Sequence, residues 1–205
     1  MPRGRSQLAV RRAREGDGDA VAELLYESAV AMYDRFAGGR ERALRLLRRA
    51  IDSEGTNASR EVVWVAELEG RAAGALAAFP VSESPARANA FLRLALRTIR
   101  PWRWPPMLWL YWAGARAAPS PPGTSLYVDA LATADWARNR GVARALLREA
   151  EAEAQHLGLP AVALDTALGN GPARALYASS GFQEMAFRPP SRSLPGFVAL
   201  VKPLD

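Results

Sequence analysis

The apolar and polar positions of this chain follow two periods, and each period predicts its own kind of element. Apolar residues at every second position predict strands, over about 7–14, 61–68, 72–79, 126–133, 161–166, 184–188 and 196–201. Apolar residues three and four positions apart predict helices, over about 20–36, 40–51, 86–99, 107–115 and 141–157, with a short one after 170–172. The order β-α-α-β-β-(insertion)-β-α-β-α-β-β is typical of a mixed α/β domain with helices on both faces of a central sheet.

The length suits a single domain over residues 1–205, with an insertion over about 81–123. The insertion contains four of the six tryptophans, at Trp102, Trp104, Trp109 and Trp112. Such an aromatic segment has four possible roles: the wall of a substrate pocket, a homodimer interface, a membrane-surface patch or a pad on the sheet. The sequence leaves these four roles open.

Composition excludes several kinds of site. The chain has no cysteine and a single histidine, His156, which excludes disulfides, a thiolate nucleophile and a multi-histidine metal centre. We therefore expect no metal.

The net charge of +6 suits nucleic acid, but arginines are spread along the chain and lysine occurs once, as expected of a compositional bias. We expect no nucleic-acid partner. No apolar segment follows the basic residues 1–14, and no apolar run approaches about 20 residues. This favours a cytoplasmic protein without a membrane partner.

The strongest candidate for a binding site follows the strand over 126–133. That strand runs through the turn Arg138–Ala143 into a helix, and the first N–H groups of a helix lack partners and carry partial positive charge. Gly141 lets the backbone approach a ligand. Three arginines add full charges: Arg138, Arg140 and Arg144. This arrangement predicts a phosphate or pyrophosphate site; an ordinary strand–helix connection in an arginine-rich chain is the alternative.

Three segments, in order and at matching spacing, resemble the GNAT superfamily of acetyl-CoA-dependent N-acetyltransferases. The turn Arg138–Ala143 matches the family's Arg/Gln-x-x-Gly-x-Gly/Ala loop, and the apolar strand before it ends in Leu131-Ala132-Thr133. Residues 170–177 with Gly181-Phe182 match its Asn-x-x-Ala-x-x-Leu-Tyr…Gly-Phe pattern. The resemblance implies a GNAT-like α/β fold: a mixed, largely antiparallel sheet of about seven strands, with helices on both faces and a helical, aromatic insertion between the third and fourth strands.

The resemblance also implies a reaction. An amine attacks the thioester of acetyl-CoA directly in a ternary complex, and the expected acceptor is a primary amine of a small molecule. A protein N-terminus or lysine as the acceptor, and a non-catalytic acyl-CoA-binding module, are the alternatives. The implied cofactor-binding residues are Arg138, Asn139, Arg140, Gly141, Val142, Ala143 and Arg144 at the pyrophosphate, and Leu131, Ala132, Thr133, Asn170, Ala173 and Tyr177 along the pantetheine and thioester.

Two residues are candidates for proton transfer. By the resemblance, Tyr177 lies near the thioester sulfur and protonates the leaving thiolate; a core tyrosine with a satisfied hydroxyl is the alternative. Asp129 is the candidate base, because it lies on the strand before the loop in the same alternation phase as Leu131 and Thr133. A solvated or paired strand carboxylate is the alternative. The residues expected at the acceptor side are Tyr26, Glu27, Trp109 and Trp112.

Overall fold

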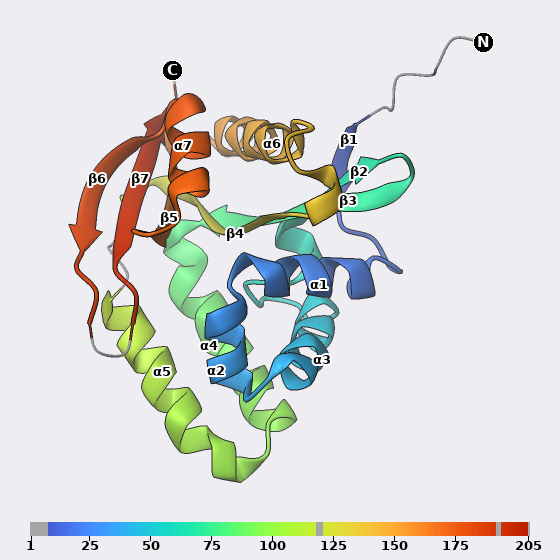
Figure 1. Cartoon of the computed structure of the whole chain (residues 1–205), viewed down its shortest axis with the longest axis vertical. Coiled ribbons are helices and arrows are strands. Elements are labelled where there is room, and N and C mark those ends of the chain that lie inside the picture. Colours follow the sequence, from blue (N-terminus) through green and yellow to red (C-terminus); the bar gives the residue numbers. More distant parts are fainter. Residues whose placement is uncertain (1–7, 118–120, 192–193, 205) are drawn as a thin grey trace.

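A seven-stranded sheet forms the centre of the computed structural model (Figure 1), which describes residues 8–117, 121–191 and 194–204. The strands lie in the order β1-β2-β3-β4-β5-β7-β6; β4 runs parallel to β5, and the other neighbours are antiparallel. The strands are β1 (Ala9–Arg12), β2 (Val63–Leu68), β3 (Arg71–Pro80), β4 (Ser125–Thr133), β5 (Ala161–Ala167), β6 (Gln183–Arg188) and β7 (Phe197–Pro203). The mixed, largely antiparallel sheet predicted from the sequence is confirmed.

Helices lie on both sides of this sheet (Figure 1). One layer contains α1 (Gly18–Ser28), α2 (Val30–Ala37), α3 (Arg40–Ile51), α4 (Ser84–Thr98) and α5 (Trp104–Ala117), and the other contains α6 (Val142–His156) and α7 (Gly171–Ser179). Each layer has its own core against the sheet. Leu25 and Leu47 are buried in the first core, and Leu76 and Leu146 in the second. We call the two sides the α1–α5 face and the α6–α7 face.

The first predicted helix, over 20–36, is two helices in the structure. α1 ends at Ser28 and α2 begins at Val30, because Ala29 has a non-helical backbone with φ −154° and ψ 51°. The Ser28 hydroxyl donates to the Leu25 carbonyl at 2.6 Å, a local bond of the kind that competes with helical hydrogen bonding. The prediction of one continuous helix is therefore wrong.

The segment between β3 and β4 forms two helices, as predicted. α4 packs against α3, and α5 packs against α2. Met107 and Leu110 of α5 are buried, whereas Trp109 and Trp112 are 52% and 54% exposed. These two tryptophans therefore lie on the outer side of α5. Within the described part of the chain, no helix has the length and hydropathy that a membrane span requires.

β3 and the start of α6 approach each other closely at Gly74. A Cβ atom at this position would lie 2.6 Å from Cγ1 of Val142 and 2.8 Å from the carbonyl oxygen of Ala132. Both distances are far inside van der Waals contact, and the carbonyl belongs to a paired strand that cannot easily move. Gly74 therefore sets the spacing between the sheet and the first turn of α6.

Gly74→Ala is expected to lower the free energy of unfolding by about 1–3 kcal/mol, since overpacking a tight contact costs about that much. Urea unfolding followed by circular dichroism measures the change. Gly114→Ala in α5 is the control, because a Cβ atom there meets open space. Alanine favours a helix, so this variant should gain about 0.5–1 kcal/mol. Equal stabilities of the two variants would contradict the close approach at Gly74.

Candidate active site

β4 and β5 separate partway along their length. Their pairing runs from Ser125 with Ala161 to Val128 with Leu164 and stops there. Beyond this point β4 pairs with β3 as far as Thr133, and β5 pairs with β7. Each strand therefore turns an unpaired edge toward the other. The N–H and C=O groups of such an edge can hydrogen-bond an extended ligand.

The loop between β4 and α6 has a backbone shape that suits an anion. Asn139 (φ 61°) and Gly141 (φ 82°) both have left-handed conformations, and Gly141 is the N-cap of α6. Successive N–H groups in such a loop, with the free N–H groups of the first helical turn, favour an anion. A pocket of about 530 Å³ opens here, lined by Thr133, Ala137, Arg138, Asn139, Gly141, Val142, Ala143, Arg144, Pro172, Ala173, Ala175, Leu176 and Ser179.

The three arginines of the loop point in different directions. Arg138 and Arg144 line the pocket, and Arg138 also pairs with Asp135 at 2.7 Å. The Arg140 guanidinium instead pairs with Glu69, on the turn between β2 and β3, at 2.5 Å, and Arg140 is not among the lining residues. The cationic side chains that line the pocket are therefore Arg138 and Arg144.

Other residues predicted along the cofactor lie outside the pocket lining. Leu131 and Ala132 belong to the part of β4 that has no partner on the β5 side. Asn170 caps α7: its Oδ1 accepts from the Ala173 N–H at 3.3 Å, and its Nδ2 donates to Thr166 Oγ1 at 3.3 Å. These bonds fix the Asn170 amide at the end of β5, beside the start of α7.

Arg138→Ala is expected to weaken CoA binding about tenfold, the loss of roughly 1.4 kcal/mol of charge-assisted contact. Gly141→Val should weaken it at least as much, because valine is strained at a φ of 82°. Isothermal titration calorimetry with CoA measures both. Arg140→Ala is the matched control and should change the affinity less than about threefold. Equal losses for Arg138→Ala and Arg140→Ala would show that the anion is not held from the pocket side.

Asp129 occupies a β-bulge in β4. Ala77 pairs with Ala130 and Ala78 pairs with Val128, so Asp129 is an extra residue without a partner in β3. The bulge lies at the point where β4 and β5 separate.

The bulge directs Asp129 toward the α1–α5 face. Ala130 packs in the core of that face, whereas Leu131 packs against the core of the α6–α7 face. The Asp129 carboxylate accepts a hydrogen bond at 3.0 Å from Nδ2 of Asn57, in the loop after α3. The sequence placed Asp129 in phase with Leu131 and Thr133. That expectation is wrong, because the bulge interrupts the alternation of the strand.

Asp129 and Asp165 flank the opening, each being the first residue after the last β4–β5 pair. Burial raises the pKa of Asp129 to about 7, the negative charge of Asp165 adds to the rise, and the Asn57 hydrogen bond opposes it. The Asp129 side chain nevertheless keeps solvent-accessible surface, so a bound molecule can reach it. A carboxyl group of this kind can exchange its proton near neutral pH, as a general base requires.

Asp165 lies within electrostatic reach of both proton-transfer candidates. Burial raises the pKa of Asp165, and the Tyr127 hydroxyl, which donates to it, opposes the rise. Tyr177 is 7% exposed and packs beside Phe182 on the α6–α7 face. Burial, and then the charge of Asp165, raise the pKa of Tyr177 to about 12. Its hydroxyl therefore stays protonated and can act as a donor.

The four residues predicted at the acceptor side do not come together. Tyr26 is buried, and its hydroxyl donates to Asp34 at 2.9 Å. Glu27 is exposed at the end of α1. Trp109 and Trp112 line a surface pocket on α5, together with Ala113 and Arg116.

The local pattern of apolar and polar residues does not predict which residues lie near Asp129. Asn57 is 72 positions away in the chain. Tyr33 of α2 is close enough that the charge of Asp129, after burial, raises its pKa. Asp165 offers a signal, since it is a charged residue directly after the apolar run 161–164.

Comparison with known proteins identifies the class. The model of the acetyltransferase (GNAT) family matches residues 23–182. The chain therefore belongs to the GNAT acetyltransferase family and is an enzyme, and this family generally uses acetyl-CoA as the acyl donor. No curated protein matches the chain.

Solved structures share the fold at low sequence identity. An N-acetyltransferase from Staphylococcus aureus has a TM-score of 0.73 at 18% identity, with 94% of this chain and 99% of that chain covered. An agmatine N-acetyltransferase has a TM-score of 0.60 at 19% identity, with coverages of 96% and 99%. The ribosomal-protein-S18-alanine N-acetyltransferase from Escherichia coli has a TM-score of 0.57 at 13% identity, with coverages of 97% and 95%. At these identities the similarity shows the fold alone.

Proposed function

We propose that this enzyme transfers an acetyl group from acetyl-CoA to the primary amine of a small molecule, by direct attack in a ternary complex. The observation that carries the proposal is the opening between β4 and β5. Asp129 lies where the opening begins, and Thr133 lines the anion pocket four residues further along β4. At a rise of about 3.3 Å per residue these positions are about 13 Å apart. Asp129 faces the α1–α5 side and the anion pocket lies on the α6–α7 side, so acceptor and donor can approach the opening from opposite faces of the sheet.

The residues present fit acetyl-CoA. The backbone N–H groups of 139–143, with Arg138 and Arg144, would hold the pyrophosphate. The unpaired edge of β4 at 131–133 would hydrogen-bond the amides of the pantetheine arm. Acetyl-CoA supplies an activated thioester to this opening. The protein contributes orientation, which removes part of the entropic barrier.

Asp129 is the proposed general base on the α1–α5 face. An amine arrives mainly as an ammonium ion and must lose a proton before its nitrogen can attack. This first proton passes to solvent, and the Asp129 carboxylate takes the second proton from the nitrogen as the N–C bond forms and the C–S bond breaks. Because Asp165 adds a second negative charge at the opening, the local field favours a cationic amine over an anionic acceptor.

Tyr177 is the proposed general acid on the α6–α7 face. Its buried hydroxyl is protonated and gives its proton to the leaving thiolate sulfur. The backbone N–H of Leu131 or Ala132, on the unpaired edge of β4, is the proposed donor to the oxyanion.

A small acceptor can reach the proposed base from solvent. Asp129 lies on the α1–α5 face near Tyr33 and Asn57, and its side chain is exposed. The structurally similar enzymes include one named for agmatine and one named for a ribosomal protein alanine, so the fold alone does not select the acceptor. Release of CoA across a panel of amines tests the proposal. Tight CoA binding without turnover on any amine would instead favour a non-catalytic acyl-CoA-binding module.

Asp129→Asn is expected to lower kcat at least about a hundredfold, because asparagine cannot accept the proton. In the unmodified enzyme, kcat should rise with pH through about 7 as Asp129 ionises, and the variant should lose this dependence. Steady-state kinetics from about pH 5 to about pH 9 measure both. A variant that keeps the same pH profile would exclude Asp129 as the base.

The same substitution is expected to stabilise the fold above neutral pH. Folding raises the Asp129 pKa from 3.8 to about 7. The ionisation of Asp129 therefore lowers stability as pH rises between these two values. Asparagine avoids this loss, so the variant should gain about 1 kcal/mol at about pH 8, a small part of the full shift because solvent reaches the side chain. The gain should vanish below about pH 4. Urea unfolding at both pH values measures it, and a variant less stable than the unmodified protein at the higher pH would contradict the shift.

Tyr177→Phe is expected to lower kcat about tenfold to a hundredfold while the KM for acetyl-CoA changes less than about twofold, because the lost hydroxyl acts in the transition state. The aromatic ring stays, so its packing beside Phe182 is kept. Initial rates with a saturating amine measure the effect. Full activity of this variant would assign Tyr177 to the core alone.

A further inference from the structure

Asn57 connects Asp129 to a loop that is distant in the sequence. The Asn57 Nδ2 donates to Asp129 Oδ2 at 3.0 Å. The other end of the amide, Oδ1, is buried and has no hydrogen-bond partner among the described residues. A buried oxygen without a partner is unfavourable, yet reversing the amide would set this oxygen against the carboxylate. The orientation of the Asn57 amide therefore keeps the hydrogen bond to Asp129 and leaves Oδ1 without one. This indicates a role for Asn57 beyond holding the loop.

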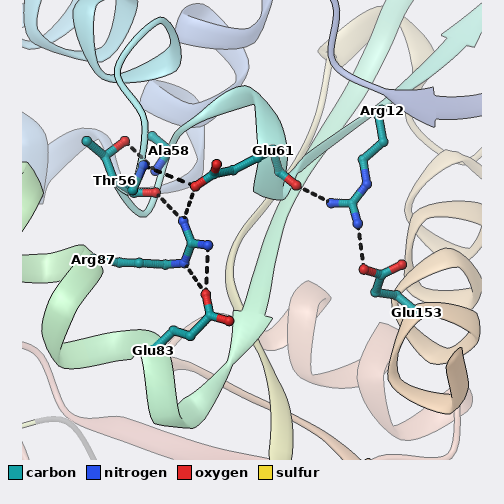
Figure 2. Close-up of polar contacts among 8 residues, drawn as sticks. Arg12, Thr56, Ala58, Glu61, Glu83, Arg87 and Glu153 are labelled. Carbon is teal, nitrogen blue, oxygen red and sulfur yellow. Dashed lines mark hydrogen bonds and ion pairs between the residues drawn. The ribbon is translucent and has the colours of Figure 1, made fainter. Parts of the chain in front are cut away.

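Arg87 of α4 holds this loop in place (Figure 2). Its guanidinium donates to the Thr56 carbonyl at 3.1 Å, pairs with Glu61 at 2.7 Å, and pairs with Glu83, in the short turn just before α4, at 2.7 Å. The Arg87 side chain is 13% exposed, so the guanidinium is largely shielded from solvent, whereas Glu61 and Glu83 are 46% and 44% exposed. Thr56 and Glu61 lie on either side of Asn57 in the chain, and Arg87 therefore clamps the loop on both sides of it.

The loop is also tied to itself and to α3. Thr56 Oγ1 donates to the Ala50 carbonyl at 2.8 Å and accepts from the Ala58 N–H at 3.3 Å (Figure 2 draws the second of these bonds). The residues before and after Asn57 therefore have fixed backbone positions. The Asn57 side chain is presented to Asp129 by a rigid support.

We propose that Asn57 is a positioning residue for acetyl transfer, which orients the Asp129 carboxylate and favours its ionised form, and that the Arg87 clamp keeps Asn57 in place. This inference rests on the proposed role of Asp129 as the base. It gives α4 a part in catalysis although α4 has no assigned contact with a substrate. The segment between β3 and β4 then acts as a brace for the base, in addition to presenting the tryptophans of α5.

Two substitutions of Asn57 should act in the same direction with different strength. Asn57→Ala removes the donor that stabilises the carboxylate, so the Asp129 pKa should rise by about half to one unit. Asn57→Asp replaces the donor with an anion of the same size, so the rise should be larger. For Asn57→Ala, kcat should then fall about twofold to fivefold at pH 7 and less than about twofold at pH 9.

Two measurements test these expectations. One is the pH profile of kcat. The other is a titration of the Asp129 carboxyl carbon by NMR, assigned by its absence in Asp129→Asn. The NMR titration needs no turnover, so an enzyme inactive on every amine would count against the proposed function and leave the test of Asn57 intact. An Asp129 titration unchanged in Asn57→Ala, or a loss of activity equal at every pH, would overturn the proposal.

Arg87→Lys tests the clamp. Lysine keeps the positive charge and loses the planar fork that reaches Thr56, Glu61 and Glu83 together. The Asp129 titration should shift in the same direction as in Asn57→Ala, by a smaller amount. Arg93→Lys is the matched control on the exposed side of α4 and should leave the titration unchanged. Equal shifts in the two lysine variants, or none in Arg87→Lys, would overturn the role of the clamp.

Discussion

The separation of β4 from β5 is the constraint on which the site depends. A parallel pair that stayed hydrogen-bonded along its whole length would leave no edge for a ligand. The first unpaired residues, Asp129 and Asp165, are both carboxylates, and like charges in a partly buried setting oppose closure of the strands. β3 and β7 remain paired to the outer edges. The opening is therefore built into a sheet that is ordered on both of its sides.

In the proposed mechanism, the two faces of the sheet have different roles. The α6–α7 face supplies the anion pocket and Tyr177, and the α1–α5 face supplies Asp129 with its partner Asn57. Both sets converge on the same few residues of β4. A donor held from one face and an acceptor admitted from the other need not compete for one entrance.

The sequence predicts the donor half of the site better than the acceptor half. The loop 138–144 and α6 are contiguous, so the spacing of glycine and arginine reports a local conformation. The proposed acceptor half joins Asn57, Asp129 and Asp165, which are far apart in the chain. The bulge depends on register with β3, and no local period reveals it. The break at Ala29 escapes prediction for a related reason, since the apolar pattern continues through it.

The pairing of β3 with β4 is regular on both sides of the bulge. Ala78 and Ala77, adjacent in β3, lie opposite Val128 and Ala130, which have one residue between them. A chain without that residue would keep the same pairs, and the side chains after it would keep their faces. Asp129 thus resembles a single-residue insertion into a strand whose pairing with β3 does not require it. In such a strand, a catalytic group can be gained or lost by a change in chain length of one residue, with no substitution at any position around it.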